Sequence, residues 1–159
     1  MALEHRISEL DTYLFAKGRH YEIYEKMGAH LAEEDGKAGT YFSVWAPNAR
    51  SVSVVGDFNN WDRTAHPMQP VQQSGIWDIF VPGVKAGDLY KFAVETSQGY
   101  TVLKADPYGN QSQLRPDNAS VVADIRYFDW TDQAWRKAHQ EKKTESPMAI
   151  YEVHPGSWK

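Results

Sequence analysis

The sequence predicts a mainly β domain, an immunoglobulin-like β-sandwich with short N-terminal helices and, after it, a C-terminal helix and an orphan strand. Apolar residues alternate with polar ones in several short segments, which is the period of a strand with one buried face. These segments recur at intervals of roughly 8–15 residues and are separated by Gly, Pro, Asn and Asp, as in sandwiches. The chain has 159 residues. That length suffices for one domain with a core, but a (β/α)₈ barrel needs about 200–250 residues.

Two short helices are expected before the sandwich. Ser8 can cap the first helix, with Asp11 at the third helical position as its capping-box partner. Gly18 ends this helix. A second short helix ends at Gly28, and residues 33–39 are expected to form a polar loop. Apolar side chains recur at helical spacing in both helices, at Leu10, Leu14, Phe15, Tyr21, Tyr24 and Met27.

The strands of the sandwich follow. The first is expected from Gly39 to Ala46, closed by Pro47, and the second includes Val52 and Val54. We expect Phe42 and Trp45 to be core residues of the first strand. Further strands are expected at residues 75–81, 89–95, 101–106 and 120–124.

After the sandwich, the sequence predicts a helix and then one more strand. Residues 129–143 predict a helix with Trp130 and Trp135 among its apolar positions, and residues 148–154 form a β-rich run. A strand without neighbours exposes its backbone polar groups and an apolar face. We therefore expect residues 147–159 to be mobile or to contact another chain. The chain is thus divided into an N-terminal helical segment (1–34), the sandwich (35–126), a helix and linker (127–147) and the orphan strand (148–159).

Composition excludes several function classes. The net charge is −4 without a basic block, which argues against nucleic-acid binding. The chain has no cysteine, so disulfides, thiol nucleophiles and thiolate zinc sites are excluded. The six histidines lack the spacing of a metal site. Apolar runs are too short to span a membrane, and the charged N-terminus does not resemble a signal peptide, so we expect a cytoplasmic protein.

The clearest local motif is a turn that presents a tryptophan. A strand ending at Val55 leads into the turn Gly56–Asn60, which is followed by Trp61. Asn and Asp suit such turns because they tolerate tight backbone conformations and hydrogen-bond their own chain. Trp61 could cap the core or lie flat on the surface, and the spacing favours neither. A flat exposed ring is what a pyranose C–H face packs against.

Several motifs together resemble the carbohydrate-binding module family 48, the isoamylase N-terminal-like domain, at the N-terminus of 1,4-α-glucan branching enzymes. The resemblance covers residues 20–159. It rests on segments 26–30, 42–49, 54–62, 66–68, 75–78, 90–92, 105–108 and 150–158. The last of these looks like the first strand of the catalytic barrel. At two positions, Met27 and Pro155, this sequence differs from the leucine that the family usually has.

The resemblance implies a sugar site, carried over residue by residue from glycogen-binding relatives such as the β subunit of AMP-activated kinase. Trp61 matches the first aromatic platform, and Trp77 matches a ring packing beside it. Lys91 matches the lysine that bonds sugar hydroxyls. Tyr100, after Gly99, is the nearest match to the second platform, and Asn118 is a candidate for the binding asparagine.

The resemblance also implies a function. The chain would be the glucan-binding portion of an enzyme that forms α-1,6 branches in glycogen, without a cofactor. Its partners would be α-glucan (glycogen, starch or maltooligosaccharide) and the catalytic barrel of the same protein. The family's catalytic carboxylates lie on later barrel strands, so this sequence lacks them. Retaining glycosyl transfer needs two carboxyl groups about 5–5.5 Å apart. We interpret the local carboxylates, Asp57 with Asp62 and those at 33–35, as structural or solvated, and expect the chain alone to be inactive.

Two alternatives remain open at this point. The chain could be a free-standing glycogen- or starch-binding module, or the module of a debranching or trehalose-forming relative. The run at 150–158 argues against the first, because a free-standing module has no use for a barrel strand.

Overall fold

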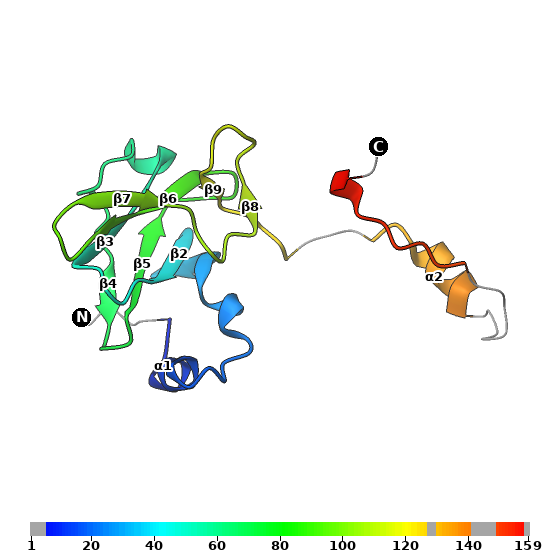
Figure 1. Cartoon of the computed structure of the whole chain (residues 1–159), viewed down its shortest axis with the longest axis horizontal. Coiled ribbons are helices and arrows are strands. Elements are labelled where there is room, and N and C mark those ends of the chain that lie inside the picture. The colour runs from blue at the N-terminus through cyan, green and yellow to red at the C-terminus, as the bar shows by residue number, and fades with distance from the viewer. Residues whose placement is uncertain (1–5, 127–129, 141–148, 158–159) are drawn as a thin grey trace. The chain divides into compact units, whose positions relative to one another are not determined.

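The computed structural model describes residues 6–126, 130–140 and 149–157 (Figure 1). The chain divides into two compact units, Met1–Arg126 and Tyr127–Lys159. No helix within the described ranges is long and apolar enough to cross a bilayer.

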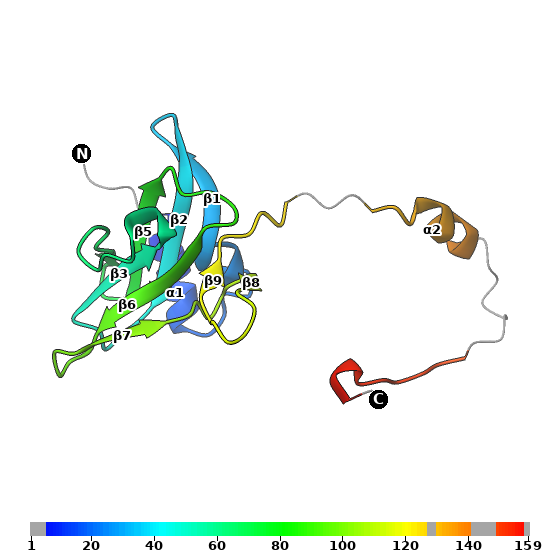
Figure 2. The ribbon, with the colours of Figure 1, turned by 90° about the horizontal axis from the view of Figure 1, so that it is seen from above.

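The first unit is a sandwich of two antiparallel sheets. Sheet A has the order β1-β2-β5-β4, and sheet B has the order β3-β6-β9-β8 with β7 also paired to β6. Figure 2 shows β3, β6 and β7 running alongside one another. The strands are β1 (Gly28–Glu34), β2 (Lys37–Trp45), β3 (Ser51–Gly56), β4 (Gln69–Val71), β5 (Ile76–Pro82), β6 (Leu89–Glu95), β7 (Thr101–Lys104), β8 (Gln111–Ser112) and β9 (Ser120–Val121).

The core between the sheets follows from strand alternation. Phe42 from β2 and Tyr90 and Phe92 from β6 are fully buried there. The Phe42 ring meets the edge of Tyr90 at 5.0 Å between centroids, and Tyr90 meets Phe92 at 5.8 Å. Edge-to-face pairs of this kind add about 0.5–1.5 kcal/mol to the burial of the rings. The predicted mainly β sandwich is confirmed.

The first strand of the sandwich begins earlier than predicted. Residues 28–34 form the edge strand β1 instead of belonging to the helical segment, and residues 33–39 are not a polar loop. Glu34 pairs with Lys37, so Asp35 and Gly36 form a two-residue hairpin turn. Both have positive φ, 50° and 71°, as this tight turn requires. The very short β4 and β8 are also additional to the predicted strands.

The N-terminal segment covers the outer face of sheet A. Its helices are α1 (Glu9–Ala16) and the 3₁₀ turn η1 (Ile23–Glu25). Ile7, Ile23 and Met27 pack with Val71 and Ile76 of sheet A in a second core. This cover buries even the outward-facing residues of β2 that alternation alone would leave exposed.

Trp45 is the exception on this face, and its predicted place in the core is wrong. It pairs with Ile76 on the outer face and is 52% exposed, and its ring forms an edge-to-face pair with Phe15 at 5.9 Å between centroids. The parity of the strand explains the difference, because Phe42 and Val44 face inward and Trp45 must then face outward.

Helix α1 has the predicted cap but buries a different face. Ser8 and Asp11 form the reciprocal capping box. Asp11 is buried, whereas Leu10 is 64% exposed. The Asp11 carboxylate also accepts hydrogen bonds from Lys26 Nζ at 2.5 Å and His20 Nε2 at 2.7 Å. A polar cluster therefore ties α1 to the segment that follows it.

We expect Asp11 to make the stability of this segment pH-dependent. Burial opposes ionisation, but hydrogen bonds from Lys26, Ser8 and His20 outweigh it and hold the pKa of Asp11 below its ordinary value of 3.8. The stabilisation is complete above that ordinary value, and it is lost progressively as the pH falls from there through the lower pKa of the folded state. Asp11→Asn should cost about 1–3 kcal/mol of unfolding free energy at pH 7. The difference in unfolding free energy between Asp11→Asn and the wild type should be smaller at pH 3 than at pH 7. Urea denaturation at both pH values measures it. An equal difference at both would contradict this role.

The second unit contains a helix but no strand in its described residues. Helix α2 spans Gln133–Gln140, inside the predicted range, and Pro155–Ser157 form a 3₁₀ turn, η3. Residues 129 and 141–143 of the predicted helix lie outside the described residues, as do 147, 148, 158 and 159. Residues 149–154 do not form the expected strand. A strand exists only through its ladder partners, and the described part of the chain supplies none to this segment.

Candidate functional site

A clamped turn holds Trp61 after β3. The 3₁₀ turn η2 (Asp57–Asn59) follows Gly56, and Asn59 is buried beneath it. Asn59 Oδ1 accepts the Gly56 N–H at 2.9 Å. Its Nδ2 donates to the Val54 carbonyl at 3.0 Å and to His66 Nδ1 at 2.9 Å. Asn59 thus links both arms of the loop, and the FNNW sequence was the signal that could have assigned it this role.

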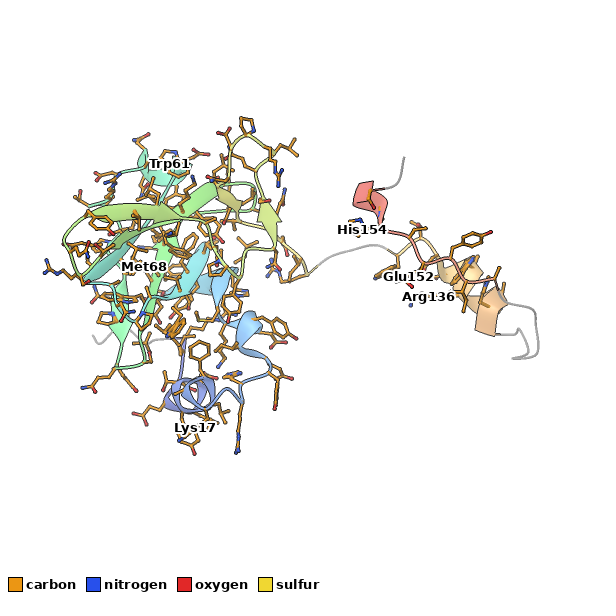
Figure 3. All side chains as sticks on the ribbon, viewed as in Figure 1. Lys17, Trp61, Met68, Arg136, Glu152 and His154 are labelled. Atoms are coloured by element: carbon orange, nitrogen blue, oxygen red, sulfur yellow. The ribbon has the colours of Figure 1, made fainter. Side chains whose placement is uncertain are left out.

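Trp61 itself is partly buried and held in a strained conformation. Its φ is +60°, which is unusual for a bulky residue and points to a functional constraint. The backbone N–H donates to the Gly56 carbonyl at 3.0 Å, and the indole Nε1 donates to Asp57 Oδ1 at 3.0 Å. In Figure 3, Trp61 lies at the margin of the sandwich, whereas the core residue Met68 lies in its middle. The ring is therefore oriented at the surface by its polar edge.

Lys91 and Asn118 meet at the same end of sheet B. Lys91 Nζ donates to Asn118 Oδ1 at 2.5 Å, although 27 positions separate the two residues. Lys91 lies on the outer face of β6 opposite Val55, and the next pair along the ladder is Gly56 with Tyr90. The turn that carries Trp61 begins at Gly56, so three of the five predicted site residues lie where β3 ends and β6 begins.

Trp77 does not lie at this end of sheet B. It lies on β5 in sheet A, packs against the core between the sheets, and donates from Nε1 to the Ala46 carbonyl at 3.1 Å. Ala46 precedes β3, whereas Trp61 follows it, so the length of β3 lies between the two rings. The contacts of Trp77 are those of a structural residue.

Tyr100 also lies apart from Lys91. It sits at the tip of the β6–β7 hairpin, where the Thr96 N–H donates to its carbonyl at 2.9 Å. The hairpin tip lies beyond Glu95, four residues or about 13 Å along β6 from Lys91. Alternation places Tyr100 on the face of Phe92, opposite to that of Lys91.

Leu103, and not Tyr100, lies on the face of sheet B that Lys91 shares. It pairs with Ala93, on the outer face that Lys91 shares, and is 42% exposed. No sequence signal identifies this residue, because its face depends on the register of the β6–β7 hairpin.

The loop before β9 presents Asn118 at the rim of a hollow. Gln113 and Ala119 close this loop through a backbone bond of 2.9 Å. The hollow has a volume of about 440 Å³ and is bounded by Ala105, Asn118 and the loop itself. Since the Oδ1 of Asn118 accepts from Lys91, its amide N–H groups are directed away from the lysine. Lys91 and Asn118 together can donate to hydroxyl oxygens.

The acidic residues of the turn have structural roles. Asp57 accepts from the Trp61 indole, and Asp62 accepts the backbone N–H and the hydroxyl of Thr64 at 2.8 and 2.7 Å. These bonds from Thr64 lower the pKa of Asp62. An acid/base catalyst needs a carboxyl group that is still protonated near neutral pH, which Asp62 is not.

Comparison with known proteins shows the family of this chain. A family model described as carbohydrate-binding module 48 (isoamylase N-terminal domain) matches residues 26–109, more than half of the chain. The chain belongs to the carbohydrate-binding module 48 family. Its match includes Trp61, Lys91 and Tyr100, but ends before Asn118.

Full-length relatives are similar to nearly the whole chain. A 1,4-alpha-glucan branching enzyme GlgB of Protochlamydia amoebophila is 53% identical over 152 residues, which are 95% of this chain and 21% of that protein. The GlgB of Marinobacter nauticus is 51% identical over 96% of this chain and 24% of its own length. The chain is therefore homologous to the branching enzymes and spans about a fifth of their length.

Solved structures of other proteins contain the same fold. A Klebsiella pneumoniae pullulanase crystallised with maltotriose superposes with a TM-score of 0.51, at 28% identity over 72% of this chain and 10% of that one. A pullulanase from Bacillus acidopullulyticus gives the same TM-score, at 25% identity over 62% of this chain and 12% of that one.

Proposed function

We propose that this chain binds linear α-1,4-glucan at the end of sheet B formed by Trp61, Lys91 and Asn118. The observation that carries the proposal is the Lys91–Asn118 pair beside the turn of Trp61. A pyranose can pack its C–H face on the indole while its hydroxyls accept from the ammonium and the amide. Leu103 adds apolar surface on the face of Lys91.

Such a site is a weak tether. One ring contributes about 1–3 kcal/mol, with base stacking as a guide, and two or three hydrogen bonds contribute about 1 kcal/mol each. The sum of about 3–6 kcal/mol corresponds to a Kd between several millimolar and some tens of micromolar for a short oligosaccharide. Glycogen presents many chain ends and segments, so retention on the polymer is stronger than this.

We further propose that the chain is the N-terminal module of a 1,4-α-glucan branching enzyme. Identity above 50% over 95% of the chain supports this enzyme class more strongly than the 28% identity to a pullulanase. Incubated with amylose, the whole protein should shift the iodine complex to shorter wavelengths as branches form. The 159-residue chain alone should leave that spectrum unchanged. Release of reducing ends without branching by the whole protein would assign it to a debranching or hydrolytic class instead.

Variants of Lys91 and Tyr100 distinguish a glucan site at the end of sheet B from one at the tip of the β6–β7 hairpin. In native electrophoresis through glycogen, Lys91→Met should weaken retention at least about tenfold, because bonds from a charged donor contribute about 1.5–3 kcal/mol. Tyr100→Ala, a truncation at the hairpin tip, should change retention less than about twofold. A larger loss for Tyr100→Ala than for Lys91→Met would overturn the placement. No retention of the wild type would overturn glucan binding altogether.

A further inference from the structure

A second hollow lies beside the start of β1, the edge strand of sheet A. Its volume is about 320 Å³. Four stretches of the chain line it: the N-terminal segment with Arg6, Tyr24 and Glu25, strand β1 with His30, the stretch after β7 with Tyr108 and Asn110, and residues 123–126 after β9. We call it the β1 hollow. It shares no lining residue with the Trp61 site.

The walls of the β1 hollow are held by specific contacts. The Arg6 backbone N–H donates to the Tyr41 hydroxyl at 2.8 Å, and its Nη2 donates to the Glu25 carbonyl at 3.1 Å. Gly28 has a φ of +94°, and a Cβ there would lie 3.1 Å from the Cβ of Tyr108. The absence of a side chain at Gly28 is therefore what lets Tyr108 approach β1 and form one wall.

His30 forms part of the lining as a neutral ring. Its Nε2 donates to the Met27 carbonyl at 2.8 Å, which fixes the orientation of the imidazole. Burial lowers the pKa of His30 below its ordinary value of 6.5. At neutral pH the ring therefore contributes hydrogen-bonding capacity without charge.

The charges around the β1 hollow balance. Arg6 and Arg126 are matched by Glu25 and Asp124, so the lining has no net charge. Arg126 is bound to the Asp124 carboxylate through two bonds of 2.9 Å. A balanced lining disfavours an isolated anion or cation and favours a neutral ligand that both donates and accepts hydrogen bonds.

The shape and chemistry of the lining indicate the ligand class. The Tyr24 ring is 59% exposed at the rim, and Tyr108 lies within the wall. Flat rings beside guanidinium, carboxylate and amide groups match the alternating C–H faces and hydroxyls of a sugar. The volume lies at the lower end of the range of about 300–1,000 Å³ for ligand pockets, which suits one or two sugar rings.

We propose that the β1 hollow is a second carbohydrate subsite, which takes one or two glucosyl units independently of the Trp61 site. The choice of glucose rests on the proposed function, whereas the hollow and its lining do not. Two subsites on one module would let it hold two chains, or two points of one chain, of the same polymer.

Maltose titration of the ¹⁵N-labelled chain, followed by NMR, tests the proposal. Maltose should shift the amide signals of Leu31, Asn110 and Ala123, which line the hollow. Tyr24→Ala should weaken the binding seen at these signals about tenfold and leave the shifts at Lys91 unchanged. Tyr21→Ala is the matched control, because this tyrosine is 85% exposed on the same segment but does not line the hollow.

Each result separates the second subsite from the first. Shifts at Lys91 and Asn118 without shifts around the β1 hollow would overturn the second subsite and leave the proposed function intact. Shifts around the β1 hollow that persist in Trp61→Gly would support independent binding. Inorganic phosphate acting on the same signals at lower concentration than maltose would overturn the assignment to a neutral sugar.

Discussion

Trp61→Gly is expected to abolish retention of the chain in glycogen while the domain stays folded. The substitution removes the ring on which a pyranose would pack. It also relieves the φ of +60°, which costs a non-glycine residue about 1–2 kcal/mol. Loss of the partly buried ring and of its bond to Asp57 acts in the opposite direction, so the unfolding free energy should stay close to the wild-type value, while the retardation in glycogen gels disappears. Native electrophoresis and urea denaturation of the same preparation measure both quantities.

Two companion variants define the role of the ring. Trp61→Phe keeps a smaller ring without the bond to Asp57 and should retain part of the binding. Trp45→Ala is the matched control, because Trp45 is 52% exposed on the other sheet. Equal retention of wild type and Trp61→Gly would exclude the indole from binding, and equal losses for Trp45 and Trp61 would exclude a localised site.

Gly56→Ala is expected to destabilise the sandwich and disrupt the same turn. A Cβ at this position would lie 2.1 Å from the Leu89 carbonyl oxygen and 2.5 Å from a ring carbon of Phe58. Both neighbours are held, the first as backbone and the second against the core. Relief requires the β3–β6 ladder to shift, so the cost should be at least about 2–3 kcal/mol. Since the Gly56 carbonyl accepts from Trp61, glycogen retention should fall as well.

Gly83→Ala is the control for this prediction. Gly83 has a φ of +82°, but a Cβ there meets no atom within 4 Å. Its cost should be confined to the left-handed backbone, about 1–2 kcal/mol, with unchanged glycogen retention. Chemical denaturation of the two alanine variants gives the comparison. Equal stabilities would show that the ladder accommodates a methyl group at Gly56.

In strand β1, the hairpin signal of the turn outweighs the charged residues that suggested a loop. The glutamates at 33 and 34 indicated a loop, yet the Asp35-Gly36 pair is a strong hairpin signal. Because β1 is an edge strand, polar side chains are tolerated on it. The hairpin could therefore have been predicted from the sequence, with the turn pair given more weight than the charges.

The candidate site was predictable only in part. The residues around Trp61 are contiguous, so the turn and its tryptophan follow from local chemistry. The face of a side chain is different, because it depends on the register of a whole strand. Trp77 points into the core and Tyr100 lies on the face opposite Lys91 for this reason. Leu103 shares the face of Lys91, and no residue near Leu103 in the sequence predicts this.

The order of residues alone determined the capped helix, the alternating strands, the tight turn and the family to which the module belongs, because each depends on neighbours within a few positions. Only the folded chain decided that Lys91 bonds Asn118, that sheet A is covered on both faces and that a second hollow opens beside β1. These features arise where distant segments pair or pack, as β6 does with β9. Such pairing is selected by the packing of the whole domain, for which no short stretch of sequence contains a sufficient signal.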